Sequence, residues 1–213
     1  FYNNFWLDGG TKAVASRRTS LIVDPPNGRV PPLTPAAQKR TEERRAYLKE
    51  HPADGPEDRS ASDRCILGFN AGPPLTPGGY NQNMQVVQTQ DHVLMVTEMV
   101  HTARIVPLDG RARLTDHIRS WSGEARGHWE GETLVIETTH FKPERGWRGA
   151  TGNMKLIERL TRIDAGTLEY KYTVIDPDTW TSPWTAAISL RLSEQPAYEY
   201  ACHEGNHSMQ GIL

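Results

Sequence analysis

Hydrophobic and polar residues alternate along most of the chain after residue 83, which is the pattern of half-buried β-strands. Short glycine-bearing segments, Glu130-Gly131-Glu132 and Asp164-Ala165-Gly166, separate neighbouring strands and predict antiparallel hairpins. The pattern therefore predicts an all-β meander. The expected strands are residues 84–90, 92–98, 101–108, 124–129, 133–141, 154–163, 167–176, 184–192 and 197–202.

A long meander has exposed edges unless its first and last strands pair, and about eight to ten strands are enough to close around a core or one small ligand. We therefore expect a lipocalin-like antiparallel β-barrel over residues 83–213. In such a barrel the last strand lies beside the strand that begins near Met84.

Residues 1–82 do not show this alternation and contain clustered prolines, which favour turns and extended segments over regular β-ladders. One helix is predicted within them, over residues 35–50. Thr34 is a suitable N-cap, Pro35 suits the first turn, and His51-Pro52 ends the helix. Its charges are mixed in sign and indicate a solvated face. We expect this proline-rich arm and its helix to pack on the barrel.

Length, net charge and hydropathy limit the kinds of partner that the chain is expected to bind. The chain has 213 residues, enough for one sizeable domain, and a formal net charge of -2, which gives no electrostatic reason to expect nucleic acid as a partner. No apolar run is long enough to cross a bilayer. The expected partner is a small-molecule ligand or another protein, and a homo-oligomer is an open alternative.

Only two cysteines occur, Cys65 and Cys202. They would form a disulfide in an oxidising compartment, and otherwise they are two buried reduced thiols. The sequence begins at Phe1 rather than Met, so a preceding segment could have been removed and the compartment stays open on this observation.

His203-Glu204-Gly205-Asn206-His207 matches the H-E-x-x-H pattern of zinc peptidases. That chemistry needs a helix, because only a helix places histidines four residues apart on one face. The preceding residues alternate as a strand does, Gly205 and Asn206 are poor helix formers, and no third ligand follows. The pattern does not predict a metallopeptidase, but His203 and Glu204 remain candidates for another kind of site.

Closure of the barrel would bring those two residues close to Glu98 and His101. The run 92–108 is too long for one strand and holds no Gly or Pro, so the chain must bend within it, and a bulge would put Glu98 and His101 on the same side. A partly buried glutamate–histidine pair suits proton transfer. The predicted catalytic residues are Glu98, His101, His203 and Glu204.

Three further hypotheses involve the same region. His101 and His203 with one carboxylate would make an open site for a divalent metal, the one cofactor these residues would bind. Arg104 would anchor an anionic or carbonyl-bearing ligand. Alternatively, the Glu-His-Arg cluster is only a structural polar core. The predicted ligand-binding residues are Arg104, Tyr170, Trp184, Tyr200 and Asn206.

Other aromatic side chains, Trp121 among them, would line a pocket or pack in the core. Glu137 and Glu158 lie in strands that are otherwise apolar, so either could point inward, although the outward direction is the commoner one.

Residues 18–26, 98–110, 129–139 and 200–206 resemble a family of bacterial proteins that is abundant in soil-type genomes and has no established activity. The family usually carries a different residue at the position of His207, which argues further against a metallopeptidase. The resemblance implies export, hence a secreted or periplasmic location, and so favours a Cys65–Cys202 disulfide.

Two classes of function follow from the sequence. The first is an enzyme that performs proton transfer, with or without a metal, in a lyase, isomerase or hydrolase reaction on a small polar or aromatic molecule. The second is a ligand-binding or assembly protein in which the polar cluster is structural. An accessible pocket that reaches His101 and His203 would favour the first class.

Overall fold

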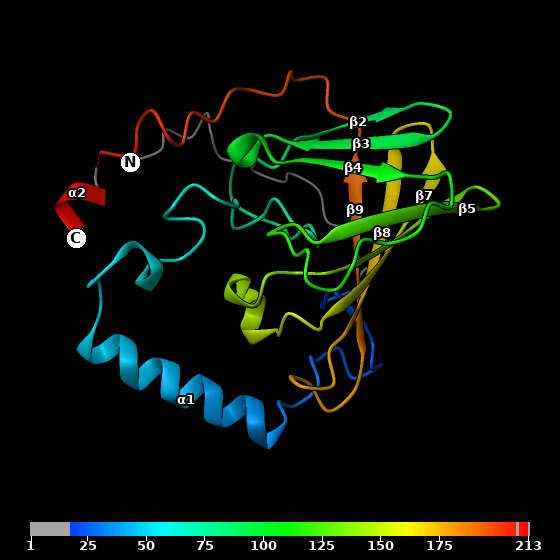
Figure 1. Cartoon of the computed structure of the whole chain (residues 1–213). Coiled ribbons are helices and arrows are strands. Elements are labelled where there is room, and N and C mark those ends of the chain that lie inside the picture. The colour runs from blue at the N-terminus through cyan, green and yellow to red at the C-terminus, as the bar shows by residue number, and fades with distance from the viewer. Residues whose placement is uncertain (1–17, 208, 213) are drawn as a thin grey trace.

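The computed structural model describes residues 18–207 and 209–212, and these form a mainly β protein whose antiparallel strands lie in two sheets (Figure 1). The larger sheet has six strands in the order β1-β9-β8-β7-β6-β5, and the smaller has three in the order β2-β3-β4. The strands are β1 (Ile22–Asp24), β2 (Met84–Gln88), β3 (His92–Thr97), β4 (Ala103–Pro107), β5 (Glu124–Glu130), β6 (Thr133–Thr139), β7 (Lys155–Asp164), β8 (Thr167–Ile175) and β9 (Trp184–Arg191).

The helical elements are fewer than the strands in the described chain. They are α1 (Pro35–Glu50), α2 (Met209–Ile212) and the 3-10 turns η2 (Pro56–Asp58), η3 (Met99–His101), η4 (Pro143–Arg145) and η5 (Trp147–Gly149). Within the described part of the chain, no helix combines the length and the apolar character that crossing a bilayer requires.

The predicted antiparallel β architecture is confirmed, but a closed barrel is not. β4 and β5 lie next to each other without sharing a hydrogen-bonded ladder, so the two sheets remain separate. The predicted strand at 197–202 is wrong, because this segment forms no β-ladder in the described residues. β1 from the N-terminal arm pairs with β9 instead, with Ile22 opposite Ala186.

The segment 197–202 forms no strand because its side chains are largely not buried. Residues 197–199 are exposed, so neither the apolar nor the polar side chains of this segment are buried. A strand that buries no face gains little to offset the entropy lost on ordering. The tail is held by a covalent bond instead.

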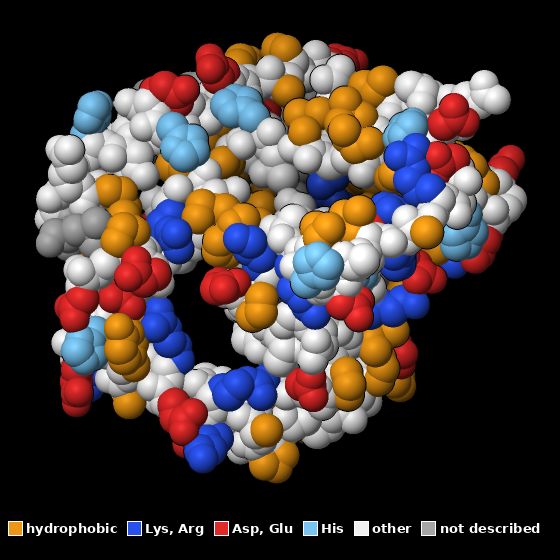
Figure 2. Space-filling model, viewed as in Figure 1, with side chains coloured by type: hydrophobic (Ala, Val, Ile, Leu, Met, Phe, Trp, Pro, Cys, Tyr) orange, Lys and Arg blue, Asp and Glu red, His pale blue; other side chains and the backbone are white. Residues whose placement is uncertain are grey.

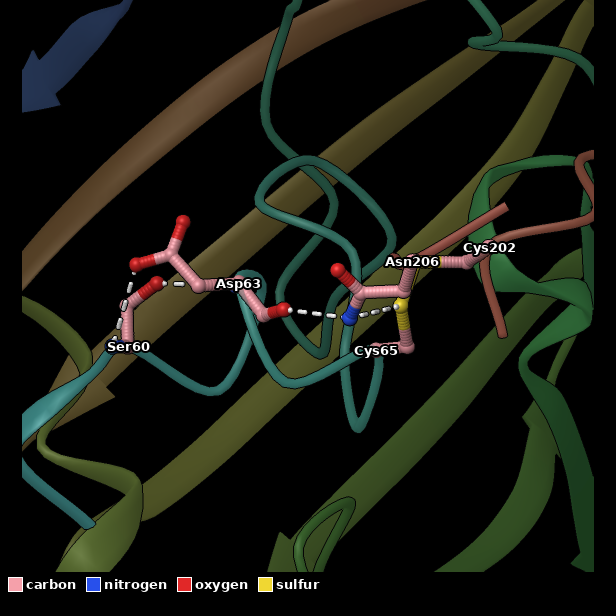
Figure 3. The surroundings of a disulfide bond; sticks show 5 residues. All are labelled: Ser60, Asp63, Cys65, Cys202 and Asn206. Atoms are coloured by element: carbon pink, nitrogen blue, oxygen red, sulfur yellow. Dashed lines mark hydrogen bonds between the residues drawn. A yellow bond between two sulfur atoms is a disulfide. The ribbon is translucent and has the colours of Figure 1, made fainter. Parts of the chain in front are cut away.

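That bond is the disulfide between Cys65 and Cys202, which confirms the predicted pairing (Figure 3). The Cα atoms are 5.7 Å apart across a sequence separation of 137 residues. Asn206 adds to the link, because its Nδ2 donates to the carbonyl oxygen of Asp63 at 3.0 Å and lies 3.4 Å from the sulfur of Cys65. The C-terminal segment and the N-terminal arm are therefore tied together.

Helix α1 has the predicted bounds, and its predicted cap is present: the Ala37 N–H donates to Oγ1 of Thr34 at 3.1 Å. Ala37 is its only buried residue. Near its start, Arg40 donates to the carbonyl oxygen of Asp178 at 3.0 Å. The rest of the helix projects from the sheets, and Figure 2 shows an opening between it and the body of the molecule.

The core lies between the inner faces of the two sheets. Met95 and Val106 point into it from the smaller sheet, and Ile136, Leu156 and Val174 from the larger. One end is filled by packed aromatic rings. Trp184 is the central ring, and the ring centroids of Trp147, Trp180 and Tyr172 lie 6.0, 5.6 and 5.9 Å from its own.

The bend predicted within residues 92–108 is confirmed, as a tight turn rather than a bulge. β3 ends at Thr97, η3 turns the chain, and β4 returns antiparallel, with the Thr97 N–H donating to the carbonyl of Thr102 at 3.0 Å. Val100 and His101 both have positive φ, of 59° and 49°. The turn therefore keeps two non-glycine residues in the left-handed region, which costs energy that the surrounding packing must offset.

Candidate functional site

Glu98 is buried, and it holds the η3 turn to the chain before β2. Its Oε1 accepts from Nδ2 of Asn81 at 2.5 Å and its Oε2 accepts from Nδ2 of Asn83 at 2.6 Å. Its own N–H donates to the carbonyl of Asn83 at 2.9 Å. Both carboxylate oxygens are thus occupied by amide donors, which suits a structural tie better than proton transfer.

The other three predicted catalytic residues are exposed. Nε2 of His101 accepts a hydrogen bond from the N–H of Tyr200 at 3.1 Å, so the tail does lie against this turn, as expected from sequence, although not as a strand. His203 and Glu204 lie in a turn at residues 202–205, before α2 begins. The two histidines of the H-E-x-x-H pattern therefore do not share a helical face.

The predicted metal site would need a third ligand beside His101 and His203. Among residues 18–207 and 209–212, no group of three or more His, Cys, Asp or Glu side chains is placed to hold a metal ion. His101 and His203 therefore gain no third ligand from the described chain.

Arg104 points inward, where it forms a bidentate ion pair with Glu158. Its Nη1 and Nη2 donate to Oε1 and Oε2 of Glu158 at 3.0 and 2.6 Å, and Nη2 also donates to Oγ1 of Thr138 at 3.2 Å. The hydroxyl of Tyr170 donates to Oε1 of Glu158 at 2.7 Å and accepts from the N–H of Leu75 at 3.1 Å. This network joins β4, β6, β7, β8 and the N-terminal arm.

Burial of this cluster shifts the pKa values of Arg104 and Tyr170. Burial by itself lowers the pKa of Arg104, but the charge and hydrogen bonds of Glu158 raise that pKa above its ordinary value. Burial raises the pKa of the Tyr170 hydroxyl well above its usual range, and the neighbouring charge of Glu158 raises it further. Arg104 therefore stays cationic and Tyr170 stays protonated.

The remaining predicted ligand-binding residues fall into two groups, one in the core and one in the C-terminal segment. Tyr170 and Trp184 are fully buried in the core. Tyr200 lies in the tail near His101, and Asn206 is engaged at the disulfide. The structure therefore does not bring the predicted ligand-binding set together as one pocket.

A cleft of about 380 Å³ opens instead where β4 passes the chain leading into β5. It is lined by Ala103, Arg104, Ile105, Ser120, Trp121, Ser122, Gly123 and Ala125. Residues 120–123 form a tight turn in which the Gly123 N–H donates to the Ser120 carbonyl at 3.2 Å. Trp121 and Ser122 are its central residues, so the turn presents both side chains at the cleft.

Gly123 is required at the end of this turn. Its φ is +70°, and a Cβ there would lie 2.6 Å from the carbonyl oxygen of Thr139. The turn also fixes the next segment, because Ser120 exchanges backbone hydrogen bonds with His140 and Lys142 at 3.0 and 2.9 Å. Lys142 is thereby placed beside Trp121.

Two cations flank the Trp121 ring. The guanidinium carbon of Arg64 lies 5.9 Å from the ring centroid, and Nζ of Lys142 lies 5.5 Å from it. Both distances are within cation–π range. In the part of the chain that the structure describes, neither cation is within ion-pairing distance of a carboxylate, and the nearby acid Asp63 is paired with Arg59 at 3.6 Å. We call this pair of cations, which lies beside the cleft-lining residue Trp121, the cationic rim of the cleft.

A larger cavity, of about 540 Å³, lies at the start of α1. Its cationic side chain, Arg40, is already engaged by the carbonyl of Asp178 and the hydroxyl of Thr179. That cation is therefore already hydrogen-bonded, whereas Arg64 and Lys142 beside Trp121 have no ion-pair partner in the described chain.

A third polar cluster lies on the outer face of the larger sheet. His140 lies between two carboxylates, with Nδ1 3.4 Å from Glu124 and Nε2 3.3 Å from Asp116. Glu124 also accepts from the N–H of Leu114 at 2.8 Å and pairs with Arg126. These contacts fasten the loop before β5 to the sheet, and neither of the two described cavities includes them.

Sequence reasoning considered Trp121 but missed Arg64 and Lys142. The segment Ser120-Trp121-Ser122-Gly123 carries a turn signal that could have been used, since Ser and Gly favour such positions. No local signal places residue 64 beside residue 121, because that contact depends on the path of the N-terminal arm.

Fold and cleft together define a two-sheet antiparallel β protein with a small, positively rimmed surface cleft. Comparisons of this chain with protein-family models, with curated proteins and with solved structures find no match.

Proposed function

We propose that the protein binds a small organic anion in the cleft between β4 and the 120–123 turn, and that it does so in an oxidising compartment, either periplasmic or extracellular. The observation that carries this proposal is the pair of cations, Arg64 and Lys142, at the Trp121 ring without a carboxylate partner in the described chain. The disulfide supports the compartment, because such bonds persist where the surroundings are oxidising.

The chemistry of the rim suits an anion. The guanidinium of Arg64 can pair with a carboxylate through two parallel hydrogen bonds, and the ammonium of Lys142 adds a second charge. The volume of about 380 Å³ is at the lower end of the range typical of small-molecule sites, about 300–1,000 Å³. A ligand of a few carbon atoms with one acidic group would fit these features.

A binding function is favoured over proton transfer. Glu98, one of the predicted catalytic residues, has both oxygens taken by Asn81 and Asn83. His101, its predicted partner in proton transfer, is exposed, and its Nε2 accepts from the backbone of Tyr200. An enzyme built on these two groups would first have to break contacts that hold the η3 turn.

The test is isothermal titration of the oxidised protein with succinate, benzoate and inorganic phosphate, with the uncharged benzamide as a comparison. We expect saturable binding of at least one anion and none of benzamide. The double variant Arg64→Gln, Lys142→Gln should bind roughly five- to thirty-fold more weakly, because each partly exposed ion pair contributes about 0.5–1 kcal/mol.

The matched control removes two cations from α1 instead. Arg45 and Lys49 are exposed, and neither lines the cleft. The double variant Arg45→Gln, Lys49→Gln should bind as the unmodified protein does. Equal losses in both double variants would mean that net charge, and not the cleft, attracts the anion, and absence of binding to all three anions would reject the proposal.

A further inference from the structure

The outer face of the smaller sheet carries an apolar stripe. Residues on β4 alternate, so that Arg104 and Val106 are buried while Ala103 and Ile105 point outward. The strand register places Ile105 opposite Leu94, and Leu94 opposite Val87. These three side chains therefore form one row across all three strands.

This row is unusually apolar for a solvent-facing surface. The outer face of a two-sided antiparallel sheet is normally polar, yet Ile105 is 64% exposed and Val87 is 42% exposed. In the neighbouring row, Val96 lies opposite both Gln85 and Ala103, so neither row carries a charge. Figure 2 shows hydrophobic side chains gathered over the region of β2, β3 and β4.

The stripe and the cleft are continuous. Ala103 and Ile105 both line the cleft, and Ile105 is also the first member of the row. With neighbouring strands about 4.8 Å apart, the row runs about 10 Å from Ile105 to Val87. An acidic group at the cationic rim would thus lie at one end of an uncharged, apolar track.

We infer that the anion bound by the cleft is an amphipathic monocarboxylate, with its carboxylate at Arg64 and Lys142 and its hydrocarbon chain along Ile105, Leu94 and Val87. This inference rests on the proposed function and specifies the ligand class. A second copy of this chain seated on the stripe would explain the apolar row alone. It would not account for the two unpaired cations beside Trp121, which lines the cleft together with Ile105.

The test compares butyrate, hexanoate and octanoate, each below its micellar range, by isothermal titration of the oxidised protein. A chain lying on an open face loses about half of its contact with water, which corresponds to about a twofold gain in affinity per methylene group. Octanoate is therefore expected to bind roughly sixteen-fold more tightly than butyrate. Octanol, which lacks the charge, should bind more weakly than octanoate.

The variant Ile105→Thr keeps a β-branched side chain on the strand and removes its apolar end. It should reduce the advantage of octanoate over butyrate, two ligands with the same carboxylate, by at least about twofold. Ile163→Thr is the matched control, because Ile163 is 58% exposed on β7, in the other sheet, and should leave the series unchanged. Circular dichroism checks that both variants are folded.

The outcomes separate the two proposals. Saturable succinate binding with no dependence on chain length would overturn the ligand class and leave the anion site standing. Failure of every anion to bind would overturn both. A concentration-dependent dimer that Ile105→Thr dissociates, as measured by sedimentation, would show a second copy on the stripe and would also overturn the ligand class.

Discussion

Replacing Glu158 by glutamine tests whether the buried ion pair holds the two sheets together. The side chains of Arg104 and Glu158 are 4% and 0% exposed, and two hydrogen bonds of 3.0 and 2.6 Å join them. Arg104 belongs to the smaller sheet and Glu158 to the larger one. Glutamine has nearly the same shape as glutamate, so the substitution removes the charge and changes little of the packed volume.

The expected loss in the free energy of unfolding is large, because Arg104 has no other charged partner in the described core when Glu158 is replaced. An arginine guanidinium keeps its proton in proteins even when it is buried, so Arg104 remains charged after Glu158 is replaced. Removing one partner of a buried pair leaves an uncompensated charge and typically costs about 3–5 kcal/mol. That is a substantial fraction of the stability of about 5–15 kcal/mol typical of a domain.

The assay is urea unfolding followed by tryptophan fluorescence and circular dichroism. Removing the second charge as well, in Arg104→Met, Glu158→Gln, should recover part of the loss, because no unpaired charge then remains in the core. Glu137→Gln is the control on the opposite face of the sheet. Glu137 pairs with Lys155 at 2.7 Å, is partly exposed, and should lose no more than about 1 kcal/mol.

Two results would refute this reasoning. One is a Glu158→Gln variant within about 1 kcal/mol of the unmodified protein, which would mean that water or a rearrangement replaces the lost charge. The other is a double variant less stable than Glu158→Gln alone. In that case packing or hydrogen bonds of Arg104, and not its charge, would dominate.

Three further effects are expected. Because burial raises the pKa of the Tyr170 hydroxyl above its ordinary value of 10.0, the contribution of this group to stability is complete below pH 10 and falls above that pH by up to about 1.4 kcal/mol per pH unit. In urea unfolding, the unmodified protein should therefore lose stability more steeply at alkaline pH than the Tyr170→Phe variant does. Equal slopes for the two proteins would contradict this prediction. Reducing the Cys65–Cys202 bond with excess dithiol should cost roughly 5 kcal/mol in the chain-entropy model, and an unchanged urea midpoint would argue against it. Thr34→Ala removes the N-cap and should cost about 1 kcal/mol, visible as faster hydrogen exchange at the start of α1; unchanged exchange there would mean that the cap contributes nothing.

The sequence predicted those parts of the fold that local chemistry determines. Helix 35–50 was predictable because Thr34, Pro35 and His51-Pro52 mark both ends. The hairpins at Gly131 and Gly166 were predictable because short glycine-bearing loops leave antiparallel pairing as the simple solution. These inferences needed no knowledge of distant residues.

Long-range features were less accessible. Alternation suggested a strand at 197–202, but alternation does not reveal whether a partner is available to cover one face. Glu158 and Glu137 looked alike from sequence, and only their register shows that Glu158 points into the core and Glu137 outward. The cleft was missed because its cations come from residues 64 and 142, which the arm and the β6–β7 connection bring together.

The position of the cleft follows from how β4 and β5 approach each other. At one end of this seam they press together at Gly127, where a Cβ would lie 2.8 Å from both Leu108 and Val106, so only glycine allows this approach without a shift of its neighbours. At the other end Gly123 terminates the 120–123 turn, and the cleft lies between this turn and residues 103–105 of β4. Arg104 is the second residue of β4 and lines the cleft, so its buried pair with Glu158 holds β4 to the larger sheet at this open end of the seam. The contacts that join the two sheets therefore also position the wall of the cleft that β4 supplies.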